Sequence, residues 1–481
     1  MDLVIKGGAL VTASETYTAD LGLTGERIVA VGQDLAGARS IDARGLLVLP
    51  GAIDSHVHLA YPQGPSRVVS ADDWLTGTVA AACGGTTSVI DFVEAAPGQT
   101  LMAAFDARRE QAAAQAVVDF GFHMTLNRAD AATLAEAPAV RAAGMSSFKI
   151  YMAYGGLRLD DGEILRAFDA LRAIGGLPII HAENHAVIMH LVDQALAAGH
   201  TEPRWHPHTR PAAAEAEATE RVLALAEVAG VPIHIVHVTA ALGLAALQRA
   251  RARRGAAWVS GEVCPQHLLL TEALYDQPGF GPARVCMAPP LRASADTAAL
   301  WAGLQTGALD FVVTDHCPFT VAQKRGQRRT PEFRRLPTGT APTPPEEPWS
   351  AELPAFNRIP GGGPGIETRL PLLYHHGVNT GRLSVNQFVA LTSTHVARRF
   401  GLYPRKGSLA PGADADLVLW DPRREVTISA ERLHQNCDDT PYEGQRVTGW
   451  PRTVLSRGQV VVENGVFVGD SGRGQYLMRT T

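Results

Sequence analysis

The fold of this chain can be read from one short stretch, Pro50-Gly51-Ala52-Ile53-Asp54-Ser55-His56-Val57-His58-Leu59. A Pro-Gly turn ends an apolar run, and the apolar residues after the turn are spaced as in a β-strand. Residues two apart on a strand face the same way, so His56 and His58 project their imidazoles to one side. Neutral imidazole is a good zinc ligand, so the pair predicts half of a metal site. The alternative is two ordinary strand-end histidines.

Composition limits the class of protein. The chain has 481 residues, 46% hydrophobic and 19% charged, which is typical of a globular protein with a large core. The net charge of -5 predicts no nucleic-acid partner and no anionic membrane surface as partner. The sequence shows neither a signal-peptide pattern nor an apolar run of the ~20 residues that a spanning helix needs. Five cysteines without Cys-x-x-Cys spacing favour a reducing cytoplasm, so we expect a cytoplasmic protein.

The order of the predicted elements indicates an α/β fold. From Ile53 onward, an apolar strand, a loop and an Ala-rich amphipathic helix follow one another repeatedly. Eight such alternations over roughly 350 residues are typical of a (β/α)8 barrel of the TIM type. The predicted barrel strands are 53–57, 86–92, 117–126, 146–151, 177–180, 232–236, 257–262 and 310–314. The predicted helices include 74–82, 101–116, 131–143, 164–173, 185–198, 212–229 and 240–254.

The two ends of the chain differ from this middle part. Residues 2–49 read as short strands, with Gly7-Gly8 as one of the turns, and short strands return after residue 404. We therefore predict a small composite β-sandwich domain formed by residues 1–52 and 404–481, beside a barrel of residues 53–403. Residues 324–354 are polar and proline-rich, and predict either a mobile loop or a lid at the barrel rim.

Five predicted barrel strands end in residues that can bind metal ions. Barrel enzymes carry their chemistry at the carboxyl ends of the strands, so these residues should meet at one rim. If these histidines only filled the core, we would not expect potential metal ligands at the ends of five different strands. His234 lies on the strand face opposite His237, so we take His237 as the ligand and His234 as structural. The predicted ligands are His56, His58, Lys149, His181, His237 and Asp315.

The number of ligands indicates two metal ions. Four imidazoles and a carboxylate are too many for one tetrahedral zinc with an open position, but suit two metals about 3.5–4 Å apart. A Lys149 ammonium would repel such ions, and Asp315 offsets only one of their charges. A carbamate formed from Lys149 and carbon dioxide would instead be an anionic bridging ligand. The alternative for Lys149 is a buried lysine paired with an acid.

Further motifs, spread along essentially the whole chain, resemble those of cyclic amidohydrolases of the dihydropyrimidinase/D-hydantoinase group. This group belongs to the metal-dependent amidohydrolase superfamily. The resemblance implies a (β/α)8 barrel with a composite β-sandwich, and two zinc ions with a carbamylated lysine at the six positions above. The matching segments are residues 50–59, 72–74, 84–87, 91–92, 148–154, 181–184, 236–238, 262–266, 288–292, 314–319, 322–324, 359–367 and 472–475.

The resemblance also implies a reaction. A hydantoin or 5,6-dihydropyrimidine ring would be hydrolysed to an N-carbamoyl amino acid by a metal-bridging hydroxide. Asp315 would act as general base and then acid, and Tyr154 would donate a hydrogen bond to the developing oxyanion. Tyr154, Ala288 and Gly361 would bind the substrate. Without the resemblance, Tyr154 would read as an apolar rim aromatic.

Two departures bear on the substrate. The family usually has Ser where this chain has Ala288, and Asn where it has Gly361. Both changes are tolerable if these positions bind the ring through backbone groups, whereas the preferred ring differs if side chains matter. We expect the loop of residues 61–70, with Tyr151 and Met152, to border the pocket for the exocyclic substituent.

Other functions stay open within and beyond this class. Allantoinase and dihydroorotase are alternatives, although no arginine follows His58 at the spacing that dihydroorotases show. Non-catalytic dihydropyrimidinase-like scaffold proteins share the fold but lose metal ligands, whereas this chain keeps all six. We expect a small-molecule cyclic diamide as the substrate and, by resemblance, a homo-oligomer, either a tetramer or a dimer.

Overall fold

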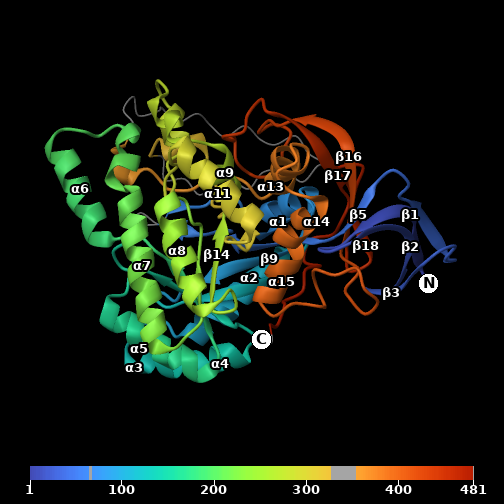
Figure 1. Ribbon diagram of the computed structural model, residues 1–481, viewed down its shortest axis with the longest axis horizontal. Helices are drawn as coiled ribbons and strands as arrows, with labels where there is room; N and C mark the ends of the chain where they lie inside the picture. The colour runs from blue at the N-terminus through green and yellow to red at the C-terminus, as the bar shows by residue number, and fades with distance from the viewer. Residues whose placement is uncertain (64–67, 327–353, 480–481) are drawn as a thin grey trace.

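A parallel eight-stranded barrel forms the centre of the molecule (Figure 1). The structure is a computed structural model that describes residues 1–63, 68–326 and 354–479; the predicted proline-rich segment lies almost entirely outside these ranges. A parallel bridge between Val57 and His316 joins the first strand to the end of the eighth. The predicted barrel is thus confirmed. Its strands are β6 (Ala52–Val57), β9 (Thr86–Val93), β10 (Asp119–Thr125), β11 (Ser147–Tyr151), β12 (Leu177–His181), β13 (Ile233–Ile235), β14 (Val259–Val263) and β15 (Phe311–Val312).

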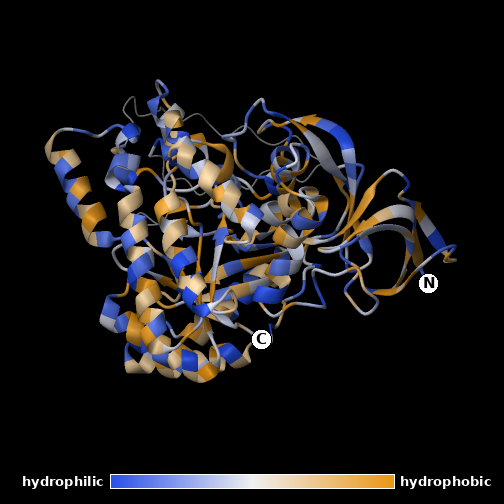
Figure 2. Ribbon diagram, viewed as in Figure 1, coloured by the Kyte–Doolittle hydropathy of each residue, from blue (hydrophilic) through white to orange (hydrophobic). Residues whose placement is uncertain are grey.

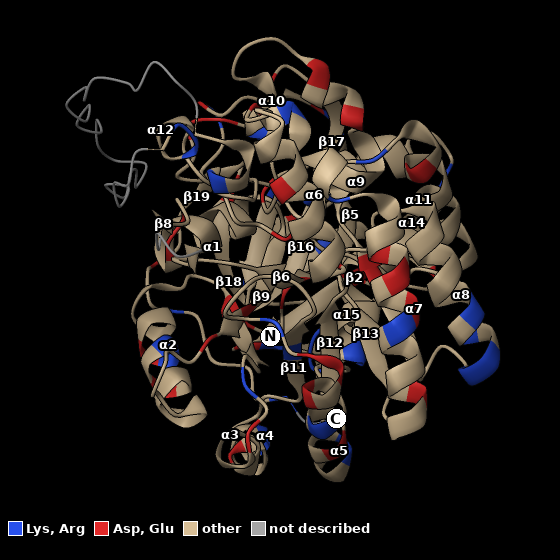
Figure 3. Cartoon of the chain, turned by 90° about the vertical axis from the view of Figure 1, so that its left-hand side faces the viewer, with Lys and Arg blue, Asp and Glu red and all other residues tan. Residues whose placement is uncertain are grey.

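Helices surround the barrel and shield its apolar strands (Figure 2). Charged residues occur along outer helices such as α7 and α8 (Figure 3). None of the described helices combines the length and apolar character needed to cross a membrane. The helices are α1 (Trp74–Cys83), α2 (Leu101–Gln115), α3 (Ala131–Ala135), α4 (Ala137–Ala142), α5 (Asp161–Ile174), α6 (His185–Ala197), α7 (Ala212–Ala229), α8 (Ala241–Arg254), α9 (Pro265–Leu269), α10 (Gly281–Arg284), α11 (Ser294–Thr306), α12 (Val321–Lys324), α13 (Arg369–Leu373), α14 (Val385–Val389) and α15 (His395–Arg399).

One predicted helix was wrong in its continuity. Residues 131–143 form two short helices, α3 and α4, that meet at Glu136. Pro138 lies in the first turn of α4. Proline has no N–H and clashes with the preceding turn, so it is tolerated at the start of a helix and not in its interior.

Both ends of the chain meet in a second sheet of nine strands. The junction is the antiparallel pair β5–β16, in which Leu49 lies opposite Val418. A core of its own, including Ile5, Leu21 and Leu419, lies within this sheet. Its strands are β1 (Leu3–Val11), β2 (Thr16–Thr24), β3 (Arg27–Gly32), β4 (Arg39–Asp42), β5 (Leu47–Pro50), β16 (Leu417–Thr427), β17 (Arg446–Ser456), β18 (Gln459–Glu463) and β19 (Val466–Phe467).

The predicted turn at Gly7-Gly8 was wrong. Both residues lie within β1, where the pairing with β2 shifts register between Ile5 and Gly8. Gly7 has φ +66° and donates its N–H to Asp20. A bulge needs a residue that adopts a positive φ at low cost, so glycine bends this strand without ending it.

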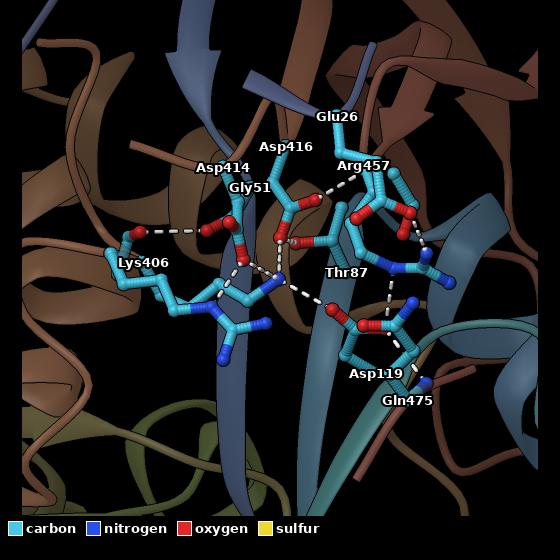
Figure 4. Close-up of polar contacts among 12 residues, drawn as sticks. Glu26, Gly51, Thr87, Asp119, Lys406, Asp414, Asp416, Arg457 and Gln475 are labelled. Carbon is cyan, nitrogen blue, oxygen red and sulfur yellow. Dashed lines mark hydrogen bonds and ion pairs between the residues drawn. The ribbon is translucent and has the colours of Figure 1, made fainter. Parts of the chain in front are cut away.

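A buried charged cluster joins the nine-stranded sheet to the barrel (Figure 4). The Lys406 ammonium lies 2.6 Å from Asp119 of β10, 2.6 Å from Asp416 and 3.0 Å from Asp414. Burial opposes this charge, but the three carboxylates hold the pKa of Lys406 well above its usual value. Arg457 adds a second cation on Asp119. These buried charges are paired with one another, so we interpret the cluster as a structural contact between the barrel and the second sheet.

Candidate metal centre

His56, His58 and Asp315 converge at the carboxyl ends of the first and last barrel strands. One Asp315 carboxylate oxygen lies 3.3 Å from His56 Nε2 and 3.2 Å from His58 Nε2. Both histidines are buried, and burial lowers the pKa of His56 well below its usual value. A neutral imidazole is the form that binds metal ions, so these three side chains can hold one cation.

A second pair of histidines lies beside this group. His181 Nδ1 is 3.0 Å from His237 Nε2, and the His237 ring centroid is 5.4 Å from that of His56. Burial lowers the pKa of both His181 and His237, so these rings too are neutral. The four imidazoles therefore form one continuous row at the rim, as the strand register predicts.

Lys149 lies buried among these groups. Its ammonium nitrogen is 5.0 Å from the ring centroid of Phe92 and 4.9 Å from that of Tyr151. Within the residues that the structure describes, Lys149 forms no ion pair with a carboxylate. Burial lowers its pKa to about 8, although Asp315 and Glu262 raise it. The described part of the structure therefore does not support the alternative that Lys149 is a buried lysine paired with an acid.

Three of the predicted site residues have strained backbones. Seven described residues other than glycine have a positive φ, and these include Tyr154 (74°), His237 (35°) and Asp315 (53°). Such conformations cost on the order of 1–3 kcal/mol each and persist only where the surroundings hold them. Their concentration at this rim is typical of a functional site.

Tyr154 lies against the histidine row. Its ring centroid is 4.9 Å from that of His181, and the Arg210 guanidinium lies 5.2 Å over its face. Burial raises the pKa of Tyr154 well above its usual value, although Arg210 opposes this effect. The phenol therefore stays protonated and can donate a hydrogen bond.

Two glutamates behind the ligands were not assigned a role from the sequence. Glu262 of β14 lies 2.6 Å from His56 Nδ1 and 3.0 Å from His234 Nε2, and Glu183 lies 2.7 Å from His181 Nε2. Carboxylates in such positions fix the ring orientation and tautomer of a ligating histidine. Glu183 follows His181 by two residues, just after the end of β12, a signal that was available; Glu262 comes from a distant strand.

Replacing Glu262 with glutamine should weaken metal binding about 10- to 100-fold, because an amide cannot accept hydrogen bonds from both ring N–H groups as the carboxylate does. Competition with a chromophoric chelator would measure the zinc Kd. Glu227→Gln, at an exposed ion pair with Arg253, is the matched control and should leave the Kd unchanged. Zinc binding by Glu262→Gln as tight as in the wild type would contradict this role for Glu262.

The remaining predicted residues, Ala288 and Gly361, lie on two backbone segments close to Asp315. Gly362 donates its N–H to Cys286, and Gly363 accepts from Cys317, two residues after Asp315. Lys324 binds the carbonyls of Cys286 and Pro360 at 3.0 and 3.3 Å. The structure thus holds both segments rigidly at the same rim as the ligands.

Two other groups of potential metal ligands have partners of their own. Asp119, Asp414 and Asp416 surround Lys406. Glu367, near Cys83, forms an ion pair with His434 at 2.9 Å. All five cysteines are buried and unpaired by disulfides. Of the three groups found among the described residues, the one that contains His56, His58 and Asp315 therefore remains as the candidate metal site.

Comparison with known proteins agrees with this geometry. A model of the amidohydrolase family matches residues 47–461. A D-hydantoinase of Geobacillus stearothermophilus is 41% identical over 483 residues, covering 100% of this chain and 97% of that protein. A D-phenylhydantoinase of Escherichia coli is 40% identical, covering 100% and 98%. The solved structure of dihydropyrimidinase from Brevibacillus agri has a TM-score of 0.91 at 40% identity, covering 100% and 99%.

Proposed function

The chain belongs to the amidohydrolase family and is a cyclic amidohydrolase, and from that premise we propose that it opens a hydantoin or 5,6-dihydropyrimidine ring to an N-carbamoyl amino acid. The observation that carries the proposal is the convergence of four imidazoles and Asp315 at one barrel rim. The relatives' names supply the class of ring.

The residues at the rim fit two divalent metal ions. Imidazole nitrogens and a carboxylate are the donors that zinc and its neighbours prefer, and the family is metal-dependent. His56, His58 and Asp315 would hold one ion, and His181 and His237 the other. Bound metals of this kind lower the pKa of water and polarise a carbonyl group.

Lys149, as a carbamate, would link the two halves of this site. Three observations support this assignment: its burial, its position among the histidines, and its lack of an ion pair within the described part of the chain. With a pKa of about 8, an appreciable fraction of its amine is neutral near pH 7, and the neutral amine is the form that adds to carbon dioxide. The product is an anion, which the neighbouring cations would stabilise.

Asp315 and Tyr154 would act on the reacting amide. The attacking water loses its proton to Asp315 while its oxygen bonds to the ring carbonyl carbon. Tyr154 donates a hydrogen bond to the carbonyl oxygen as negative charge develops there. Asp315 then gives the proton to the ring nitrogen, and the C–N bond breaks. The Ala288 and Gly361 segments would hold the ring by backbone groups.

The test is steady-state hydrolysis of hydantoin, 5-phenylhydantoin, dihydrouracil and allantoin by zinc-loaded protein. We expect an N-carbamoyl amino acid from at least one of the first three rings, and loss of that activity after metal removal by a chelator. A preference for allantoin would favour allantoinase. Failure of metal-replete protein to open any ring would contradict the function and favour a scaffold role.

A further inference from the structure

The backbone N–H and C=O of Gly361 are bound by a side chain of the protein itself. Gln63 donates its amide N–H to the Gly361 carbonyl at 2.5 Å and accepts the Gly361 N–H at 2.8 Å. Gln63 ends β7 (Pro62–Gln63), which pairs antiparallel with β8 (Val68–Val69). Tyr61 and Val68 share a small apolar cluster with Cys317, two residues after Asp315. The contact thus joins β7 to the Gly361 segment.

The neighbouring backbone groups are held by more rigid partners. Lys324, a buried side chain, binds the carbonyl of Pro360, while Gly362 and Gly363 pair with the backbone of Cys286 and Cys317. A Cβ at Gly361 would meet only the Met287 Cα, at an ordinary 3.9 Å. Gly361 therefore presents one donor and one acceptor to Gln63, and the space where a side chain would start is nearly open.

Only an amide with its N–H and C=O on the same edge can bind the Gly361 N–H and C=O together. A chain peptide is trans, so its N–H and C=O point in opposite directions. A primary amide, as in glutamine, presents both groups on one edge. A ring amide is held cis by its ring and presents the same edge. The Gln63 side chain is therefore a chemical counterpart of the ring that the proposed function requires.

We propose that the Gln63 amide is an internal competitor for the ring amide at Gly361, so that residue 63 sets the affinity for substrate. This inference rests on the proposed function, because it takes Gly361 as part of the ring-binding site. Substrate binds only when Gln63 has released Gly361. The apparent dissociation constant then rises by the reciprocal of the fraction of molecules in which Gly361 is free.

The test replaces Gln63 with methionine, which is similar in size but forms neither hydrogen bond. We expect the KM for hydantoin to fall about five- to tenfold with kcat unchanged, because Gly361 is then always free. The Kd of 2-imidazolidinone, a cyclic urea with the same cis edge, should fall by the same factor in calorimetry on zinc-loaded protein. Gln194→Met, on the exposed face of α6, is the matched control and should change neither value.

The two measurements separate this inference from the proposed function. If the wild type hydrolyses no ring, the proposed function fails, while the Kd of 2-imidazolidinone still reports on competition at Gly361. A Kd that is unchanged or higher in Gln63→Met would overturn the inference, since Gln63 would then be neutral or a contact to the ligand.

Discussion

Replacing Lys149 with alanine should lower kcat/KM by at least about a thousandfold, which corresponds to roughly 4 kcal/mol of transition-state stabilisation. The physical reason is charge. Among the proposed ligands, Asp315 brings a single negative charge to a site proposed to hold two divalent ions, and the Lys149 carbamate would add a second. Without it, we expect fewer than two zinc ions per chain by elemental analysis.

The outcome can be separated from simple misfolding. Short carboxylic acids such as acetate or propionate, added with zinc, should restore part of the activity, because they place a carboxylate where the carbamate stood. Wild-type protein exposed to ¹³C-bicarbonate should show a carbamate carbon signal in NMR, and Lys149→Ala should not. Full activity and two zinc ions in Lys149→Ala would contradict the bridging role of Lys149.

Replacing Asp315 with asparagine should lower kcat by at least about a thousandfold, since both a general base and a charged metal ligand are lost. Asparagine keeps the size of the side chain but cannot accept the proton from water or return it to the ring nitrogen. We expect a smaller change in KM, because the ring would be held by the Ala288 and Gly361 segments. Rapid-quench measurement of a single turnover would show whether the chemical step is slowed.

Asp310→Asn is the matched control for this variant. Asp310 lies five residues earlier, just before β15, and forms an ion pair with Arg251 at 2.9 Å, away from the histidine row. This variant should be less stable to heat but close to the wild type in kcat. If Asp315→Asn kept more than about a tenth of wild-type kcat with its metal bound, another group would have to move the proton.

The barrel was predictable because its signal is local. Alternation of apolar strands with amphipathic helices is written into segments of ten to twenty residues, and short loops leave few ways to connect them. The predicted elements were wrong where a single proline or glycine changed the local backbone. Pro138 divides one predicted helix into α3 and α4, and Gly7 bends a strand where a turn was expected.

The residue types at the rim were predictable for a related reason. A parallel barrel brings the carboxyl ends of all its strands together, so residues such as His56, His181 and Asp315 must become neighbours once the strands are assigned. The pairing of each histidine with its partner could not be read in the same way. The same rule places Glu262, the last residue of the seventh predicted strand, at this rim, but nothing local pairs it with His56, which lies 206 residues away in the chain.

The barrel, and the residue types at its rim that can bind metal ions, follow from patterns in the sequence. Which side chains face each other across the fold depends on the folded chain: Glu262 lies behind His56, the Gln63 amide binds Gly361, and Lys406 lies among three aspartates. The reason is physical. Strand and helix periodicity sets which face a residue occupies, whereas contacts between distant residues depend on barrel closure and on the docking of the terminal sheet.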